Sequence, residues 1–441
     1  MKQNLNGKPL IKINIHWLLT MLLAWGMAAS VQAVQFYDIS RPGIKKIKLH
    51  ISTNDDSAKT KAFVGHITRQ MNHSLFFELV ESDAEYALEM DQTVESGSMS
   101  AELKSLSDSG FEPLEFGISF KSGDDSYLKR KSAQVGNLML KKFFGVKGSI
   151  GSSLVYSMND ASKTQSKTLY TSFFGDPEQI PVTKNLFSNY GASWDPSGNF
   201  ILYTAVTSSG TTVYMQQFRP LRLRSTRVFS DKGKGSAASW GSNDLIYVAK
   251  YVKRQNTDIY EYRLDTKDPQ NLSGEKIYAI PNPKLLQVRR ITKSSTIETE
   301  PTLSPDGKQL ALMSDRTGTP QIYLYGMKSK KLKRITQKGD YNVSPSWSPD
   351  GRYIAYSGRR DNVFSIFRIE TKTMEENRVT PKSINAEGPT WSPDGSLIAF
   401  SGKKKGSGDW KIYYSLSSGG GYKRLTKSKS GFQETSPSWK P

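Results

Sequence analysis

Histidine and cysteine, which carry much of the nucleophilic and metal chemistry of proteins, are scarce in this sequence of 441 residues. The chain has no cysteine, and its four histidines are His16, His50, His66 and His73. A serine nucleophile needs a base such as histidine within hydrogen-bond reach, and most structural zinc sites use histidine or cysteine. Because no histidine lies beyond position 73, we predict no catalytic residues, no metal site and no cofactor.

Carboxylates are the other side chains that could do chemistry. Glycosidases place two of them across a pocket, and the sequence indicates no such pair. A glycine-rich run at 419–421 continues as Tyr-Lys-Arg, without the Gly-Lys-Ser/Thr of a phosphate-binding loop. The adjacent acids stand in polar segments, where we expect them to be solvated: Asp55 and Asp56, Asp124 and Asp125, Glu375 and Glu376.

A repeated motif shows which elements position the side chains of the second half. A tryptophan, or once a leucine, precedes a sequence of the type Ser-Pro-Asp-Gly. A spacing of 44 to 63 residues indicates one supersecondary unit per repeat, as in a propeller or solenoid. The first residues of the six motifs are Trp194, Trp240, Leu303, Trp347, Trp391 and Trp439.

The content of each repeat favours a propeller. Alternating apolar runs such as 353–356 and 366–369 follow the motif, and a short run ending in Arg-hydrophobic-Thr closes the repeat. Such runs between Gly, Asp and Ser turns predict strands. Four strands per repeat make one blade, so the sequence predicts an all-β six-bladed β-propeller. The last repeat stops after its first strand, and we expect strands at Leu154, Leu169 and 180–183 to complete its blade.

The motif itself has a structural interpretation. Proline fixes φ and Asp-Gly turns the chain, so Ser-Pro-Asp-Gly predicts a tight turn between two strands. The alternative is a calcium site, but one carboxylate per motif falls far short of the six to eight oxygens that calcium takes. The tryptophans are predicted to be structural anchors that pack between blades: Trp194, Trp240, Trp347, Trp391 and Trp439.

The longest interval contains extra residues, which we place at 274–289 on the approach to the third blade. This insertion could be a contact element or a tolerated loop, and the sequence favours neither.

The N-terminal third has a different organisation. Residues 1–33 are typical of a signal peptide, with three lysines, an apolar stretch and small residues at Val31 and Ala33. We expect cleavage near Ala33 and export to the periplasm; the alternative is an uncleaved membrane anchor. Residues 34–148 predict an α/β N-terminal domain with helices near 58–71 and 127–144, and a hinge at 145–149 leads into the propeller at 149–441.

The formal charge of +20 first raises nucleic acid or another polyanion as a partner. The lysines and arginines are spread along the whole chain, however, which favours a solvated basic surface. We therefore expect no nucleic-acid binding. A glycan- or polyanion-binding propeller stays open as an alternative, as does a hydrolase or peptidase-like propeller enzyme.

The combination of export signal, α/β domain and six repeats resembles the TolB family of the Tol-Pal cell-envelope system. The junction at 141–150 and Thr299-Glu300-Pro301 are similar to family motifs. The leucine at 303, the missing proline in the second motif and the insertion depart from the pattern. The resemblance implies a monomeric, non-enzymatic periplasmic adaptor that supports outer-membrane integrity and cell division, and that meets membranes only through its partners.

Two partner sites are implied by this resemblance. A TolA-type inner-membrane protein would bind the start of the mature chain: Val34, Gln35, Phe36, Tyr37, Asp38, Ile39 and Ser40. The peptidoglycan-associated lipoprotein (Pal) would bind positions just before the anchors, which the repeats bring to one rim of the channel: Tyr190, Ser236, Thr299, Glu300, Val343, Ser344, Glu387, Thr435 and Ser436. The alternative is that these residues only form turns ahead of a strand.

Overall fold

The structure of the protein is a computed structural model. It describes residues 46–93, 98–108, 110–119, 124–160, 166–176, 178–184, 187–218, 225–229, 234–242, 244–253, 256–265 and 284–441. The expected signal peptide at 1–33 and the segment Val34–Ser40 lie outside these residues, as does most of the expected insertion. Within the described ranges, no helix is long and apolar enough to span a membrane.

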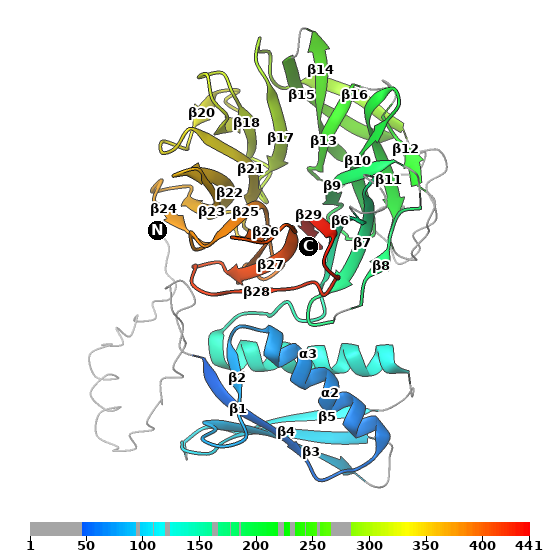
Figure 1. Cartoon of the computed structure of the whole chain (residues 1–441), viewed down its shortest axis with the longest axis vertical. Coiled ribbons are helices and arrows are strands. Elements are labelled where there is room, and N and C mark those ends of the chain that lie inside the picture. Colours follow the sequence, from blue (N-terminus) through cyan, green and yellow to red (C-terminus); the bar gives the residue numbers. More distant parts are fainter. Residues whose placement is uncertain are drawn as a thin grey trace, which may run out of the picture. The chain divides into compact units, whose positions relative to one another are not determined.

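The first part is an α/β structure, as predicted. Its elements are β1 (Ile47–Thr53), α2 (Ala58–His73), β2 (Phe77–Leu79), β3 (Tyr86–Thr93), β4 (Ser98–Ser105), β5 (Leu114–Ser119) and α3 (Asp125–Phe144). The sheet has the order β2-β1-β3-β4-β5, with β1 parallel to both of its neighbours. Both helices lie on the same face of the sheet (Figure 1).

The helices begin at capping residues that the sequence supplies. The side chain of Ser57 accepts the N–H of Thr60 at the start of α2, and Asp124 accepts that of Ser126 at the start of α3. The ring of His66 lies 2.7 Å from Asp125 and ties the two helices together. The acidic pair at 124–125 therefore has a structural role beyond the solvated one expected from sequence.

The junction after α3 is pinned to that helix. Gly145 ends the helix in the left-handed conformation, with φ 69°. The amide of Asn137 then bonds both the N–H and the C=O of Ile150, at 3.0 and 3.1 Å. A Cβ at Gly148 would lie 2.3 Å from Oδ1 of Asn137, so this close approach requires glycine.

Six four-stranded antiparallel sheets form the blades of the propeller (Figure 1). Five follow one another along the chain. Their strands are β9 (Ser188–Trp194), β10 (Phe200–Thr207), β11 (Gly210–Gln217) and β12 (Ser225–Arg227); β13 (Gly235–Trp240), β14 (Leu245–Lys253), β15 (Asn256–Asp265) and β16 (Lys284–Arg290); β17 (Glu298–Leu303), β18 (Gln309–Ser314), β19 (Gln321–Gly326) and β20 (Leu332–Arg334); β21 (Tyr341–Trp347), β22 (Tyr353–Arg360), β23 (Val363–Glu370) and β24 (Glu376–Arg378); β25 (Ile384–Trp391), β26 (Leu397–Lys404), β27 (Lys411–Leu416) and β28 (Tyr422–Arg424).

The sixth blade joins the two ends of the propeller, as predicted. Its strands are β29 (Phe432–Trp439), β6 (Ser153–Asp160), β7 (Thr168–Phe173) and β8 (Ile180–Pro181), in that order. Trp439 lies opposite Leu154 in the antiparallel pair of β29 and β6. The ring therefore closes by hydrogen bonds between strands far apart in sequence.

The expected position of the insertion was wrong in part. Residues 284–290 form β16, the outer strand of the blade that begins at β13, and Leu285 lies opposite Leu264. The outer strand is longer here, with seven residues against three in β20, because its partner β15 has ten. The additional residues therefore belong to the connection between β15 and β16 and not to the approach to the third blade.

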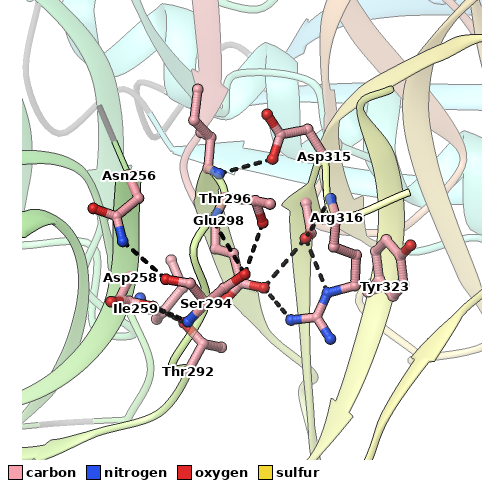
Figure 2. A network of polar contacts seen from close by, with 12 residues as sticks. Asn256, Asp258, Ile259, Thr292, Ser294, Thr296, Glu298, Asp315, Arg316 and Tyr323 are labelled. Atoms are coloured by element: carbon pink, nitrogen blue, oxygen red, sulfur yellow. Dashed lines mark hydrogen bonds and ion pairs between the residues drawn. The ribbon is translucent and has the colours of Figure 1, made fainter. Parts of the chain in front are cut away.

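The Arg-hydrophobic-Thr run fastens each outer segment to its blade. The hydroxyl of the threonine accepts an N–H from the third strand of the blade. The donors are Ile322 to Thr336 at 3.1 Å, Ile366 to Thr380 at 2.9 Å and Ile259 to Thr292 at 2.9 Å. Figure 2 shows this fastener around Thr292, where the buried carboxylate of Asp258 also accepts the N–H of Ser294. The arginine of this run, Arg290, forms an ion pair with Asp258.

The tryptophans that begin the motifs are buried or half-buried. In three of them the indole N–H donates to a carbonyl in the neighbouring blade's first strand: Trp194 to Ser438 at 3.0 Å, Trp347 to Thr302 at 3.1 Å and Trp391 to Ser346 at 3.0 Å. The indole N–H of Trp439 donates to the hydroxyl of Ser152 at 2.6 Å. The motif aspartates stabilise their own turns. Oδ1 of Asp350 accepts the hydroxyl of Ser348 at 2.6 Å and the N–H of Arg352 at 3.0 Å.

Candidate functional site at the channel mouth

The first strand of every blade carries a left-handed residue three positions before its anchor. These residues are Gly191 (φ 63°), Ala237 (46°), Glu300 (54°), Ser344 (55°), Gly388 (62°) and Ser436 (55°). The register of each first strand shifts at this point, which defines a β-bulge. A conformation that is costly for most residues and recurs six times indicates a geometry imposed by the ring.

The six bulges line one cavity of about 540 Å³. Six of the predicted rim residues lie on its wall: Tyr190, Ser236, Thr299, Glu300, Ser344 and Ser436. A neighbouring cavity of about 300 Å³ is lined by Ser344, Glu387, Gly388, Ser401, Trp410, Thr435 and Ser436. The structure thus brings eight of the nine predicted residues to these two cavities. Val343 is partly buried and lines neither of them.

Hydroxyl groups of one blade hold the bulges of the next. The bulge N–H of Ala237 donates to Thr204 at 3.1 Å, that of Gly388 to Ser357 at 2.8 Å, and that of Ser436 to Ser401 at 2.9 Å. Each acceptor lies on the second strand of the preceding blade, opposite the residue just before that blade's own bulge. These bonds link the bulges of three blades to the blade before each of them.

Glu300 replaces the hydroxyl where the pattern fails. Met313 occupies the equivalent position before the bulge at Ser344, and a thioether is only a weak acceptor. The carboxylate of Glu300 instead accepts the N–H of Ser344 at 2.6 Å and its hydroxyl at 3.2 Å. Burial raises the pKa of Glu300, and the two bonds from Ser344 oppose that shift.

Glu387 differs from Glu300 although both face the channel. Its carboxylate makes no hydrogen bond or ion pair with any residue that the structure describes, and burial raises its pKa. Some residues of the site escaped the prediction from sequence. Ser401, in the second strand β26, and Trp410, in the connection between β26 and β27, line the smaller cavity. Ser357, in the second strand β22, holds the bulge at Gly388. One feature of the sequence could have indicated that Trp410 is not an anchor: it lies outside every anchor motif.

A further cavity, of about 330 Å³, is basic. Four of its lining residues are Lys382, Lys403, Lys404 and Lys405. The ammonium of Lys382 pairs with Asp361 at 2.8 Å, and Lys404 lies over the rings of Tyr413 and Tyr422 at 5.9 Å. Some of the basic surface therefore gathers at one place. Across the described ranges, no group of three or more His, Asp or Glu side chains could hold a metal ion.

The family described as TolB beta propeller domain matches residues 273–441. Curated relatives that are also named TolB match a longer segment of the chain. One of them, "Tol-Pal system protein TolB" of Bordetella pertussis, is 27% identical over 213 residues. The propeller of this chain is similar in sequence to TolB propellers. A second relative, "Protein TolB homolog" of Chlorobium luteolum, is 25% identical over 186 residues.

These matches are partial in sequence. The first covers 48% of this chain and 43% of the Bordetella protein, and the second covers 42% of this chain and 37% of the Chlorobium protein. The chain thus spans less than half the length of the curated relatives it matches. The crystal structure of TolB from Acinetobacter baumannii superposes with a TM-score of 0.74 at 19% identity, over 91% of this chain and 98% of that one. This likeness concerns the fold, and it extends to the α/β part.

Proposed function

We propose that this chain is a non-catalytic periplasmic adaptor of a Tol-Pal system. It binds the lipoprotein Pal at the channel mouth and a TolA-type inner-membrane protein through Val34–Ser40. In this role it supports outer-membrane integrity and cell division as a monomer, and it contacts membranes through its partners. The proposal includes a signal peptide cleaved near Ala33, an α/β domain at 34–148 and a propeller domain at 149–441.

The ring of six bulges is the observation that supports a protein partner. It presents hydroxyls and small side chains on a fixed backbone, around a cavity of about 540 Å³. Such a surface can hydrogen-bond to a protein without large rearrangement, which lowers the cost of binding. It offers no histidine base, since every histidine precedes position 74.

Two variants and two partners test the proposal. Tyr190→Ala combined with Thr299→Ala removes polar contacts from the rim, and we expect it to abolish capture of the lipoprotein but not of the inner-membrane protein. Deletion of residues 34–40 should do the reverse. Ser329→Ala, in the exposed turn between β19 and β20, is the matched control. Capture of both partners by both variants, with folding verified by circular dichroism, would contradict the proposal.

The four-lysine cavity supports a second candidate function, the binding of an anionic glycan or other polyanion. Lys403→Glu with Lys405→Glu should shorten retention on a heparin column more than Lys328→Glu with Lys330→Glu, which changes the same charge on another blade. Equal shortening would indicate that only the net charge matters.

A further inference from the structure

We infer that the cavity lined by Glu387 and Trp410 is a binding site for one cationic side chain, the guanidinium of an arginine or the ammonium of a lysine. The side chain is supplied by a protein that docks on the channel mouth. The chemistry of the site follows from the cavity itself, and only the identity of the docking protein rests on the proposed function.

The carboxylate is the first observation. The chain carries 61 lysines and arginines against 41 aspartates and glutamates, so most acids can find a base. Glu387 is partly buried, yet no described residue donates to it. A carboxylate withdrawn from water without a donor is costly for the free protein, and a charged donor removes that cost on binding.

Lys167 and Lys411, which contact or neighbour residues of this cavity, are already engaged elsewhere. Lys167 donates to the hydroxyl of Thr435 at 2.9 Å and forms no ion pair with Glu387. The buried ammonium of Lys411 donates to Ser428, Lys429 and Phe432, at 2.8, 2.6 and 2.9 Å. Among the residues that the structure describes, none neutralises this carboxylate, which stays available to an external group.

The aromatic wall is the second observation. Trp410 is the one tryptophan after the expected signal peptide that stands outside an anchor motif. Its backbone is fixed from both sides, because its N–H donates to Gln433 at 2.9 Å and its C=O accepts the N–H of Glu434 at 2.9 Å. Tryptophan attracts cations more strongly than other aromatic side chains, and guanidinium groups also stack on it.

The remaining wall sets the size and polarity of the site. Ser344, Ser401, Thr435 and Ser436 contribute hydroxyls, which can accept further N–H bonds from the ligand. A volume of about 300 Å³ suits the end of one long side chain. A metal ion fits this wall poorly, since calcium takes six to eight oxygens and the wall holds a single carboxylate.

The test uses the full chain labelled with 5-fluorotryptophan and ¹⁹F NMR. Trp410→Phe assigns the resonance of Trp410. We expect that resonance to move on titration with N-acetyl-argininamide or N-acetyl-lysinamide. It should not move with N-acetyl-citrullinamide, which has nearly the shape of the arginine probe without its charge. Glu387→Gln should weaken the arginine response by about tenfold, because it removes the charge of the acceptor. Glu375→Gln, in the exposed turn before β24, should leave it unchanged.

Several results would overturn the inference: an equal response to citrulline, an unchanged response in Glu387→Gln, no response to either cation at saturation, or a response to calcium instead. The same variants are then titrated with the lipoprotein. Loss of arginine binding with unchanged lipoprotein binding would confirm the cation site and contradict the assignment of the lipoprotein to it. Parallel loss of both supports the site and the proposed function together.

Discussion

The carboxylate of Glu300 holds the bulge at Ser344, 44 positions further along the chain, by accepting its N–H at 2.6 Å. At three other bulges, those of Ala237, Gly388 and Ser436, a serine or threonine hydroxyl of the preceding blade accepts the bulge N–H. The sequence suggested that Glu300 faces a partner. The structure shows a side chain already engaged between two blades, so its substitution affects the ring first.

Glu300→Ala should therefore lower the free energy of unfolding by about 1–3 kcal/mol, because it leaves a buried N–H without an acceptor. Glu300→Gln keeps an acceptor oxygen and should lose much less. Urea denaturation of the two variants measures the difference. If both variants unfold like the parent, the contact with Ser344 contributes nothing to stability.

Closure by β29 makes a second prediction. Removal of residues 435–441 eliminates the pairing of Trp439 with Leu154 and opens the sixth blade. We expect a large fall in melting temperature, whereas removal of Pro441 alone, which is exposed, should have little effect. A truncated chain that melts with the parent would show that β6 and β7 are stable without β29.

The anchor Trp391 is 6% exposed, and its indole N–H donates to the backbone of the preceding blade. Trp391→Ala should cost about 3–5 kcal/mol, which is typical of a large aromatic side chain lost from a core. Trp410→Ala should cost clearly less, because Trp410 is partly exposed and lines a cavity. Equal losses in chemical denaturation would contradict the distinction between anchor and cavity wall.

The exposed Arg316 forms an ion pair with the fully buried carboxylate of Glu298 (Figure 2). Arg316→Met leaves this buried carboxylate without its cation and should cost about 1–3 kcal/mol. Adding Glu298→Gln removes the charge and should restore part of this loss. The free energies of unfolding of the single and double variants measure the coupling between the two side chains. If the double variant is no more stable than Arg316→Met, the buried charge of Glu298 is not the cause of the loss.

We expect Glu387 to lower the stability of the free protein while it serves the binding of a cation. Burial raises its pKa in the folded protein, so the stability it contributes is full below its usual pKa and is lost as the pH rises through the raised value. At neutral pH the carboxylate therefore costs stability, and Glu387→Gln should melt above the parent. The difference should vanish as the pH falls below the usual pKa of glutamate. A variant less stable than the parent at pH 7 would mean that the carboxylate has a donor in the free protein.

Much of the fold could be predicted because its signals are local. The motif Trp-Ser-Pro-Asp-Gly predicts both a tight turn and a tryptophan packed between blades. The number of times it recurs predicts the number of blades. The pairing of Trp439 with Leu154 followed from an incomplete last repeat. The outer strand 284–290 was assigned to the insertion because its length depends on the length of its partner strand β15. The spacing of the repeats does not predict the length of either strand.

The sequence predicted which residues gather at the rim, but not which contacts they make with one another. Glycine at positions 191 and 388 suggests a left-handed conformation there. The residue types Ala237 and Glu300 do not suggest one, although both adopt it. The role of Glu300 depends on Met313 in the adjacent strand, a contact visible only in three dimensions. Trp410 was missed because it belongs to no motif, although it shares a cavity wall with the predicted Glu387.

The closing blade also has a consequence for the time course of folding. The indole of Trp439 bonds Ser152, which lies 287 positions earlier in the chain. Contacts between such distant positions form late, because the loop between them must first be brought together. Until the final strand arrives, β6 exposes an unpaired edge of the kind that invites association between chains. Slow synthesis or slow delivery of the last ten residues should therefore increase aggregation far more than an equal pause within any single earlier blade.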